Sequence, residues 1–165
     1  MSYRTLILGL PRSMTYWTAV TLGFDHDVSA WPVEAPKPGL CDTGFILLPP
    51  EGRQKYFDTE TKFVWLRRPE AEVLASITRN FPTAAPSSSV AAALAHTNTQ
   101  LKAFFASRPC LELLAPLSPH GLFRLAAYLG RESEHPQWVR ALQVRRDRLD
   151  DPAIRASLPT LNPQP

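Results

Sequence analysis

Cysteine is scarce in this chain of 165 residues, which contains only Cys41 and Cys110. Two cysteines are too few for a disulfide framework, and neither belongs to a Cys/His spacing that binds a metal. We expect both to be reduced and structural, because a free cysteine behaves as a small buried hydrophobic residue. Long apolar runs are also missing, and the amino terminus lacks the layout of a signal peptide. The expected protein is therefore soluble and cytoplasmic, without a membrane partner.

The chain has a moderate share of charged residues and a small positive net charge. Charged residues make up 20% of the chain, the formal net charge is +3, and the pI is near 9.1. Basic residues gather at Arg67 and Arg68, and again between Arg140 and Arg148. The second group alternates with aspartates, which is typical of a solvated helix face. No basic stripe interleaved with aromatic residues and no nucleic-acid-binding module is found, so a nucleic-acid partner is not expected.

Apolar segments of strand length alternate with segments of helical period. With 44% hydrophobic residues, the chain is expected to form one domain over 1–150, followed by a proline-rich tail over 151–165. This alternation predicts an α/β fold, a three-layer α/β/α sandwich around a central parallel sheet. The expected strands are 5–10, 28–31, 44–48, 62–66 and 109–114, and the expected helices begin near 13, 69, 90, 118 and 136.

The first strand leads into a turn that is suited to an anion. The run from Thr5 to Leu10 is continuously apolar, as expected of a parallel strand covered on both faces. Gly9, Pro11 and Arg12 form the turn, and a helix opens near Ser13. Unpaired N–H groups at a helix N-terminus favour an anion, and the Arg12 guanidinium adds a forked donor for phosphate or sulfate oxygens.

A second unit repeats this arrangement. The strand 62–66 runs directly into Arg67, Arg68 and Pro69, and Pro69 is well placed at the first position of a helix that reaches Asn80. Right-handed connections bring the carboxyl ends of parallel strands to one edge of a sheet. We therefore expect Arg12 and the pair Arg67/Arg68 on the same rim.

The two turns resemble the donor-binding motifs of sulfotransferases. Gly9-x-Pro11-Arg12-Ser13-x-Thr15-x-Trp17 is similar to the family's 5′-phosphosulfate loop, although Met14 stands where the family has glycine and Tyr16 where it commonly has a second threonine. The Arg-x-Pro segment followed by Ser76 resembles the family's 3′-phosphate motif. Alignment on Pro69 selects Arg67 as the binding arginine, whereas alignment on Ser76 selects Arg68. In addition, the segment 121–130, which ends in Leu-Gly, is similar to a helix late in the family fold.

The resemblance implies a topology like that of P-loop NTPases and a sulfotransferase activity. The donor would be 3′-phosphoadenosine 5′-phosphosulfate, and the acceptor a hydroxyl group of a small molecule, carbohydrate or peptide, with no metal required. Arg12 would stabilise the transferred sulfuryl group. The implied donor-binding residues are Pro11, Arg12, Ser13, Met14, Thr15, Tyr16, Trp17, one of Arg67 and Arg68, and Ser76.

A general base must accept the proton of the acceptor hydroxyl. Some family members use a glutamate roughly twenty residues after the first loop, and Glu34 falls there, within a Pro/Gly-rich loop over 25–42. His26 and Asp42 are the alternatives. His26 lies between Asp25 and Asp27, which favour its protonated form, and Asp42 is suited to starting a turn.

Two other functions remain open at this point. The substitutions at Met14 and Tyr16 and the short chain are compatible with a non-catalytic module that keeps the fold for nucleotide binding or interaction. A P-loop nucleotide kinase is the third alternative. It is disfavoured because Thr15 and Tyr16 occupy the places of its Lys-Ser/Thr pair. Neither the acceptor nor the oligomeric state follows from the sequence.

Overall fold

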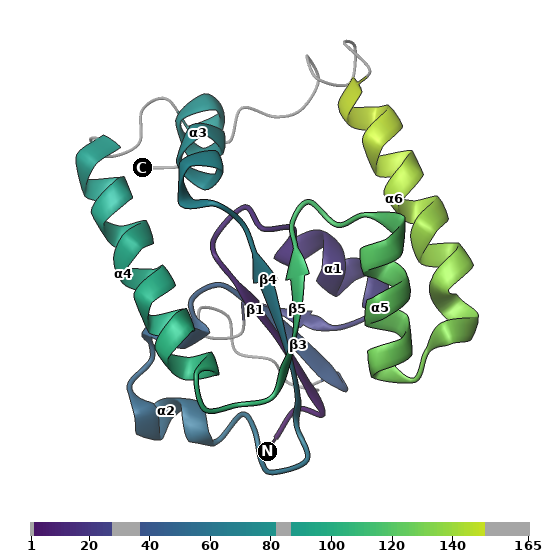
Figure 1. The fold of residues 1–165 in the computed structure, drawn as a ribbon, viewed down its shortest axis with the longest axis horizontal. Helices are drawn as coiled ribbons and strands as arrows, with labels where there is room; N and C mark the ends of the chain where they lie inside the picture. The colour runs from purple at the N-terminus through teal and green to yellow at the C-terminus, as the bar shows by residue number, and fades with distance from the viewer. Residues whose placement is uncertain (1, 28–36, 82–86, 151–165) are drawn as a thin grey trace.

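The structure, a computed structural model, describes residues 2–27, 37–81 and 87–150, with the backbone alone at 87 and 146–150. Helices and strands alternate along most of this length (Figure 1). In chain order the elements are β1 Thr5–Gly9, α1 Thr15–Leu22, β2 Asp25–His26, β3 Gly39–Asp42, a 3-10 helix Phe45–Leu47, α2 Pro50–Gln54, β4 Lys62–Arg67, α3 Glu70–Asn80, α4 Ser87–Phe105, β5 Cys110–Leu114, α5 Pro119–Leu129, a 3-10 helix Glu132–Glu134 and α6 His135–Asp150.

The strands form one parallel sheet. Within the described residues it has five strands in the order β2-β3-β1-β4-β5. Strand β1 lies at the centre, paired with β3 on one side and β4 on the other, so Leu8 is in register with both Asp42 and Trp65. Because all pairings are parallel, the carboxyl ends of the strands lie along one edge. The expected α/β class with a parallel sheet is confirmed.

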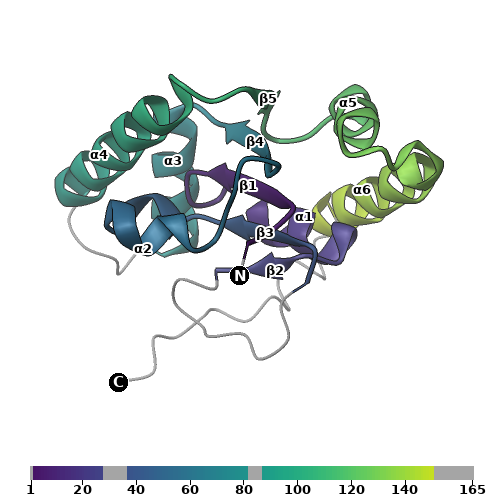
Figure 2. The ribbon, with the colours of Figure 1, turned by 90° about the horizontal axis from the view of Figure 1, so that it is seen from below.

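Helices cover both faces of this sheet, with α2, α3 and α4 on one side and α1, α5 and α6 on the other (Figure 2). Strand β1 is buried throughout, and its apolar side chains serve both cores. Leu6 and Leu8 belong to the cluster that contains Leu101 and Phe104 of α4, whereas Ile7 belongs to the cluster that contains Leu125 of α5. Burial of each such side chain stabilises the fold by about 1.5–3 kcal/mol.

One expected strand is wrong. The segment 44–48 forms a 3-10 helix over Phe45–Leu47, and the strand beside β1 is instead Gly39–Asp42. The reason is Asp42, whose Oδ1 accepts hydrogen bonds from the backbone N–H groups of Gly44 (2.6 Å) and Phe45 (2.7 Å). This carboxylate turns the chain immediately after the strand. Phe45 and Ile46 are buried all the same, which explains the apolar composition that suggested a strand.

Three expectations lie outside the described residues. They are the strand over 28–31, most of the linker before α4, and the tail over 151–165. Among the helices that the structure describes, none combines the length and the apolar character needed to cross a membrane.

Candidate functional site

The loop between β1 and α1 lies at the carboxyl edge of the sheet, as expected. Its backbone has positive φ at Arg12 (65°) and at Met14 (67°), and the N–H of Ser13 bonds to the carbonyl oxygen of Leu10. Helix α1 then begins at Thr15 without a side-chain cap. The N–H groups of its first turn therefore have no acceptor within the helix, and they favour an anion in front of them.

Gly9 makes this loop possible. A Cβ on Gly9 would lie 2.8 Å from the carbonyl oxygen of Leu66 on β4 and 3.3 Å from Cβ of Ser13. The loop therefore folds tightly over the neighbouring strand, with Ser13 fully buried beneath it. Within the described part of the chain, Ser13 Oγ has no hydrogen-bond partner, so a buried hydroxyl remains free inside the loop.

Met14 occupies the left-handed position directly before α1. Its side chain is only 7% exposed and packs in the core cluster of α1, α5 and α6. The N–H of Leu117 bonds to Met14 Sδ at 3.2 Å. The side chain that stands in the place of the sulfotransferase glycine therefore points into the core, where its contacts offset the strain of the positive φ.

The turn between β4 and α3 lies against this loop. Arg68 Nη1 donates a hydrogen bond to the carbonyl oxygen of Arg12 at 2.6 Å. Arg12 Nε in turn donates to Oγ of Ser76 on α3 at 3.4 Å, and its guanidinium lies over the ring of Phe81, 5.8 Å from the centroid. The structure thus brings together Arg12, Arg68 and Ser76 from two separate strand-to-helix units.

Arg67 lies apart from this group. Its Nη1 forms an exposed ion pair with Glu112 on β5 at 2.9 Å, and its guanidinium lies 5.0 Å from the ring centroid of Trp65. Of the two arginines that the sequence left as alternatives, Arg68 is the one that contacts the first loop. Arg68 also forms an ion pair with Glu72, at 3.4 Å.

A third guanidinium, that of Arg145, interacts electrostatically with these two, and no sequence motif identified it. Arg145 of α6 was expected on a solvated helix face, but it is partly buried. Burial, together with the nearby positive charges of Arg12 and Arg68, lowers the pKa of the Arg145 guanidinium, which still carries its charge at neutral pH. No pattern within α6 indicates this placement, because the alternation of basic and acidic residues there is typical of a solvated face.

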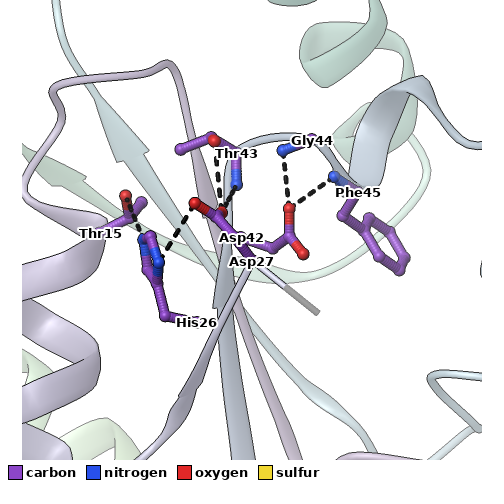
Figure 3. Close-up of polar contacts among 7 residues, drawn as sticks. All are labelled: Thr15, His26, Asp27, Asp42, Thr43, Gly44 and Phe45. Carbon is purple, nitrogen blue, oxygen red and sulfur yellow. Dashed lines mark hydrogen bonds and ion pairs between the residues drawn. The ribbon is translucent and has the colours of Figure 1, made fainter. Parts of the chain in front are cut away.

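The candidate base His26 belongs to β2, and its side chain lies beside Thr15, the first residue of α1 (Figure 3). Its Nε2 is 3.4 Å from Oγ1 of Thr15, and its Nδ1 is 3.1 Å from Oδ2 of Asp27. Asp27 also accepts a hydrogen bond from the N–H of Thr43 at 3.0 Å. Asp25 faces elsewhere and bonds to the Tyr3 hydroxyl at 3.1 Å, so only one of the two flanking carboxylates contacts the imidazole.

The other two candidate bases have different positions. Asp42 is 1% exposed, and its Oδ1 accepts the two backbone N–H groups of the turn after β3, as drawn in Figure 3. Its environment is that of a turn-forming residue. Glu34 lies outside the described residues. Tyr16 is 67% exposed and meets the His26 ring edge-on, with 5.3 Å between centroids.

A small pocket opens on the α3/α4 side of the same turn. It has a volume of about 150 Å³, and its walls include the apolar side chains of Leu10 and Trp65. Arg67, Arg68 and Lys102 also line it, against the single carboxylate of Glu70. Glu70 accepts a hydrogen bond from the Asn98 amide at 2.5 Å. The excess of cations extends the positive character of the site into this pocket.

In the residues that the structure describes, no group of three histidine, cysteine, aspartate or glutamate side chains is placed to hold a metal ion. Comparison with protein-family models, with curated proteins and with solved structures finds no match to this chain.

Proposed function

We propose that this chain is a small sulfotransferase-like enzyme that binds 3′-phosphoadenosine 5′-phosphosulfate and transfers its sulfuryl group to a hydroxyl acceptor. The observation that supports this most directly is the contact between two strand-to-helix turns. Arg12 and Arg68 come from the turns after β1 and β4, and they are joined through a 2.6 Å hydrogen bond. Ser76 lies within 3.4 Å of Arg12. A ligand with two anionic groups would meet cationic donors from both turns.

The strand order supports the topology that this proposal requires. The two turns follow β1 and β4, which are neighbours in the order β2-β3-β1-β4-β5. That order, with the anion loop after the central strand, is in keeping with a P-loop NTPase-like fold. Ligands of open α/β sheets bind at the carboxyl ends of the strands, and the turns that carry Arg12 and Arg68 follow the carboxyl ends of β1 and β4.

The residues of the first loop fit a phosphate or sulfate group. Such a group needs several donors and positive charge, and the loop offers the N–H groups at the start of α1, the Arg12 guanidinium and the hydroxyl of Ser13. This hydroxyl is fully buried and has no partner in the part of the chain that the structure describes. Met14 packs into the core, so its side chain does not compete with an anion in front of the helix.

In the proposed reaction, the acceptor oxygen attacks sulfur while the bond between sulfur and the bridging oxygen breaks. The acceptor proton passes to a base, and the products are a sulfate ester and 3′-phosphoadenosine 5′-phosphate. Negative charge builds up on the leaving oxygen, and Arg12 is the residue placed to stabilise it. Transfer of this kind depends mainly on positioning and charge stabilisation.

Glu34 and His26 remain the candidate bases. In favour of His26, the chain Asp27–His26–Thr15 has separations of 3.1 Å and 3.4 Å, and a carboxylate on Nδ1 orients an imidazole for proton transfer. Asp42 is the weaker choice because the turn amides use its Oδ1. We expect one of the two variants Glu34→Gln and His26→Gln to abolish transfer, and the other to retain it.

Calorimetric titration with 3′-phosphoadenosine 5′-phosphate tests the proposal. We expect binding below millimolar concentration without added metal, weakened in Ser76→Ala. Arg12→Ala should reduce transfer to a panel of hydroxyl acceptors more than it reduces binding. No binding at millimolar concentration would end the proposal, and ATP binding that requires Mg²⁺ would favour a nucleotide kinase instead.

The second candidate is a non-catalytic nucleotide-binding or interaction module with the same fold. The observation that favours it is Tyr16, a large exposed side chain at the start of α1 where the sulfotransferase pattern has a small threonine. Tight binding of 3′-phosphoadenosine 5′-phosphate, with no transfer to any acceptor of a broad panel, would support this module over an enzyme.

A further inference from the structure

The small pocket beside the second turn combines an apolar floor with charged walls. Leu10, Trp65 and Leu66 line it and are buried, whereas Leu114, at the end of β5, lines its exposed side. Its volume is about 150 Å³, and a cavity of roughly that volume holds a benzene ring. The pocket therefore offers apolar surface to a ligand body of this size.

Two of the three cations in the pocket walls are already paired with carboxylates. Arg67 Nη1 lies 2.9 Å from Oε2 of Glu112, and Arg68 Nε lies 3.4 Å from Oε2 of Glu72. Lys102 of α4 differs from both arginines. Its exposed side chain lines the pocket, and within residues 2–27, 37–81 and 88–145 its ammonium group has neither an ion pair nor a hydrogen bond.

The carboxylate in the pocket walls is compensated by the protein itself. Glu70 Oε1 accepts a hydrogen bond from Nδ2 of Asn98 at 2.5 Å. Glu70 is also the first residue of α3, where the helix dipole favours a negative charge. Asn98 and Lys102 are four residues apart on α4, and residues at this spacing share a helix face. The pocket thus holds a satisfied carboxylate and an ammonium group that is still free to bind an anion.

We propose that this pocket binds a small organic carboxylate, a ligand with one negative charge and an apolar body about the size of a benzene ring. Lys102 supplies the charge that binds the carboxylate. Arg67 adds further donors, because a guanidinium has five N–H groups and the contact with Glu112 uses Nη1 alone. The apolar body is buried against Leu10, Trp65 and Leu114.

The charges around the pocket favour a monoanion over a phosphate group. A phosphate monoester carries nearly two negative charges at neutral pH. The second charge would meet the carboxylate of Glu70, since the other two cations already have partners. A carboxylate needs only the one free cation.

This inference goes beyond the proposed function and does not depend on sulfuryl transfer. Arg68 lines the pocket, but its Nη1 faces the carbonyl oxygen of Arg12 in the anion loop. The loop uses Arg12 as its cation, and the pocket uses Lys102. We therefore expect the two sites to be neighbours that can be occupied at the same time.

Three ligands of nearly equal size test the charge that the pocket prefers. Benzoate, benzyl alcohol and benzylamine are each titrated into the ¹⁵N-labelled full chain and followed by NMR. We expect benzoate to bind in the millimolar range, as suits a ligand of about nine heavy atoms, and to shift the signals of pocket residues such as the Asn98 side-chain amide. The neutral and cationic ligands should bind at least about fivefold more weakly.

Two results of this titration would overturn the proposal. Binding of benzyl alcohol or benzylamine as tight as that of benzoate would remove the preference for a carboxylate. Benzoate shifts centred outside the pocket, or no shifts at millimolar concentration, would remove the site.

Lysine variants test the role assigned to Lys102. Lys102→Met keeps most of the stem and alters an exposed side chain, so the fold should persist. Lys55→Met is the matched control, because Lys55 is also exposed and is not part of the pocket walls. We expect Lys102→Met to weaken benzoate binding by about fivefold or more and Lys55→Met to change it by less than about twofold. Equal affinities of the two variants would contradict the assignment.

A last titration separates this site from the proposed nucleotide site. Benzoate is added with and without saturating 3′-phosphoadenosine 5′-phosphate, and we expect its affinity to change by less than about threefold. Competition between the two ligands would place both in one site and overturn the second site. If the nucleotide does not bind at all, the sulfotransferase proposal falls, and the benzoate titrations alone decide the carboxylate pocket.

Discussion

The guanidinium of Arg68 donates a hydrogen bond to the backbone carbonyl oxygen of Arg12 at 2.6 Å. This contact links the turn after β4 to a loop residue that itself has positive φ (65°). An arginine in the second turn therefore orders the backbone of the first. Because Arg68 is only partly exposed, its charge is screened less by solvent than that of a surface arginine.

Replacing Arg68 should therefore damage anion binding more than replacing its neighbour. We expect Arg68→Met to weaken binding of 3′-phosphoadenosine 5′-phosphate by about tenfold or more, since it removes a cation and releases the carbonyl of Arg12. Arg67→Met is the control, because the Arg67 charge is already engaged by Glu112. Titration calorimetry on both variants checks this, and equal losses would show that Arg68 has no special place in the site.

Met14→Gly should cost stability without changing anion affinity. The substitution removes a side chain that is 7% exposed and packed in the core, and it also relieves the strain at φ 67°. Loss of the buried side chain outweighs the relief, so we expect unfolding free energy to fall by about 2 kcal/mol in urea denaturation.

The affinity of Met14→Gly for 3′-phosphoadenosine 5′-phosphate tests where the side chain points. Because Met14 Sδ accepts the N–H of Leu117 in the core, we expect affinity within about twofold of the unaltered protein. A large gain in affinity would mean that Met14 crowds the space in front of α1, contrary to the arrangement described above.

Gly9→Ala should destabilise the fold through a direct clash. The new Cβ would lie 2.8 Å from the Leu66 carbonyl oxygen, which is backbone and cannot move aside cheaply. We expect a loss of about 1–3 kcal/mol in unfolding free energy. Gly52→Ala is the matched control, because its Cβ would meet the Pro49 ring at 3.4 Å and alanine favours the helix. Similar stabilities of the two variants would contradict the tight packing of the loop.

The sequence predicted the parts of this fold that local patterns determine. The apolar run at β1 indicated a strand covered on both faces, and Leu6 and Ile7 do pack into opposite cores. The segment 44–48 was predicted wrongly because its apolar residues are buried without pairing in the sheet. There, a single carboxylate on Asp42 bonds to the next backbone N–H groups and decides the local structure.

The composition of the site was only partly predictable. Local spacing identified Arg12 and the second turn, but the choice between Arg67 and Arg68 depends on which way each side chain leaves the strand end. Arg145 was missed because charge alternation along α6 suggests a solvated face. Its proximity to Arg12 depends on how α6 packs against α1, and no pattern within α6 encodes that packing.

The last prediction concerns the anchor between α1 and α6. Arg131 forms an ion pair with Glu134 at 2.6 Å while it bonds to the Leu22 carbonyl oxygen. The hydrogen bonds from Arg131 hold the pKa of Glu134 below its ordinary value of 4.5. A carboxylate with a lowered pKa in the folded state adds stability above its unfolded pKa, and this contribution is lost as pH falls through the folded value.

Glu134→Gln should therefore lower the unfolding free energy by about 0.5–1 kcal/mol at neutral pH, in the range of a partly exposed ion pair. The difference from the unaltered protein should shrink as pH falls below the ordinary carboxyl pKa of 4.5, and it should be lost as pH falls through the lowered pKa of Glu134 in the folded state. Urea denaturation across this range measures it, with Glu132→Gln, an exposed neighbour in the same 3-10 helix, as the control. A difference that is constant with pH would mean that packing, and not the charge of Glu134, holds Arg131 in place.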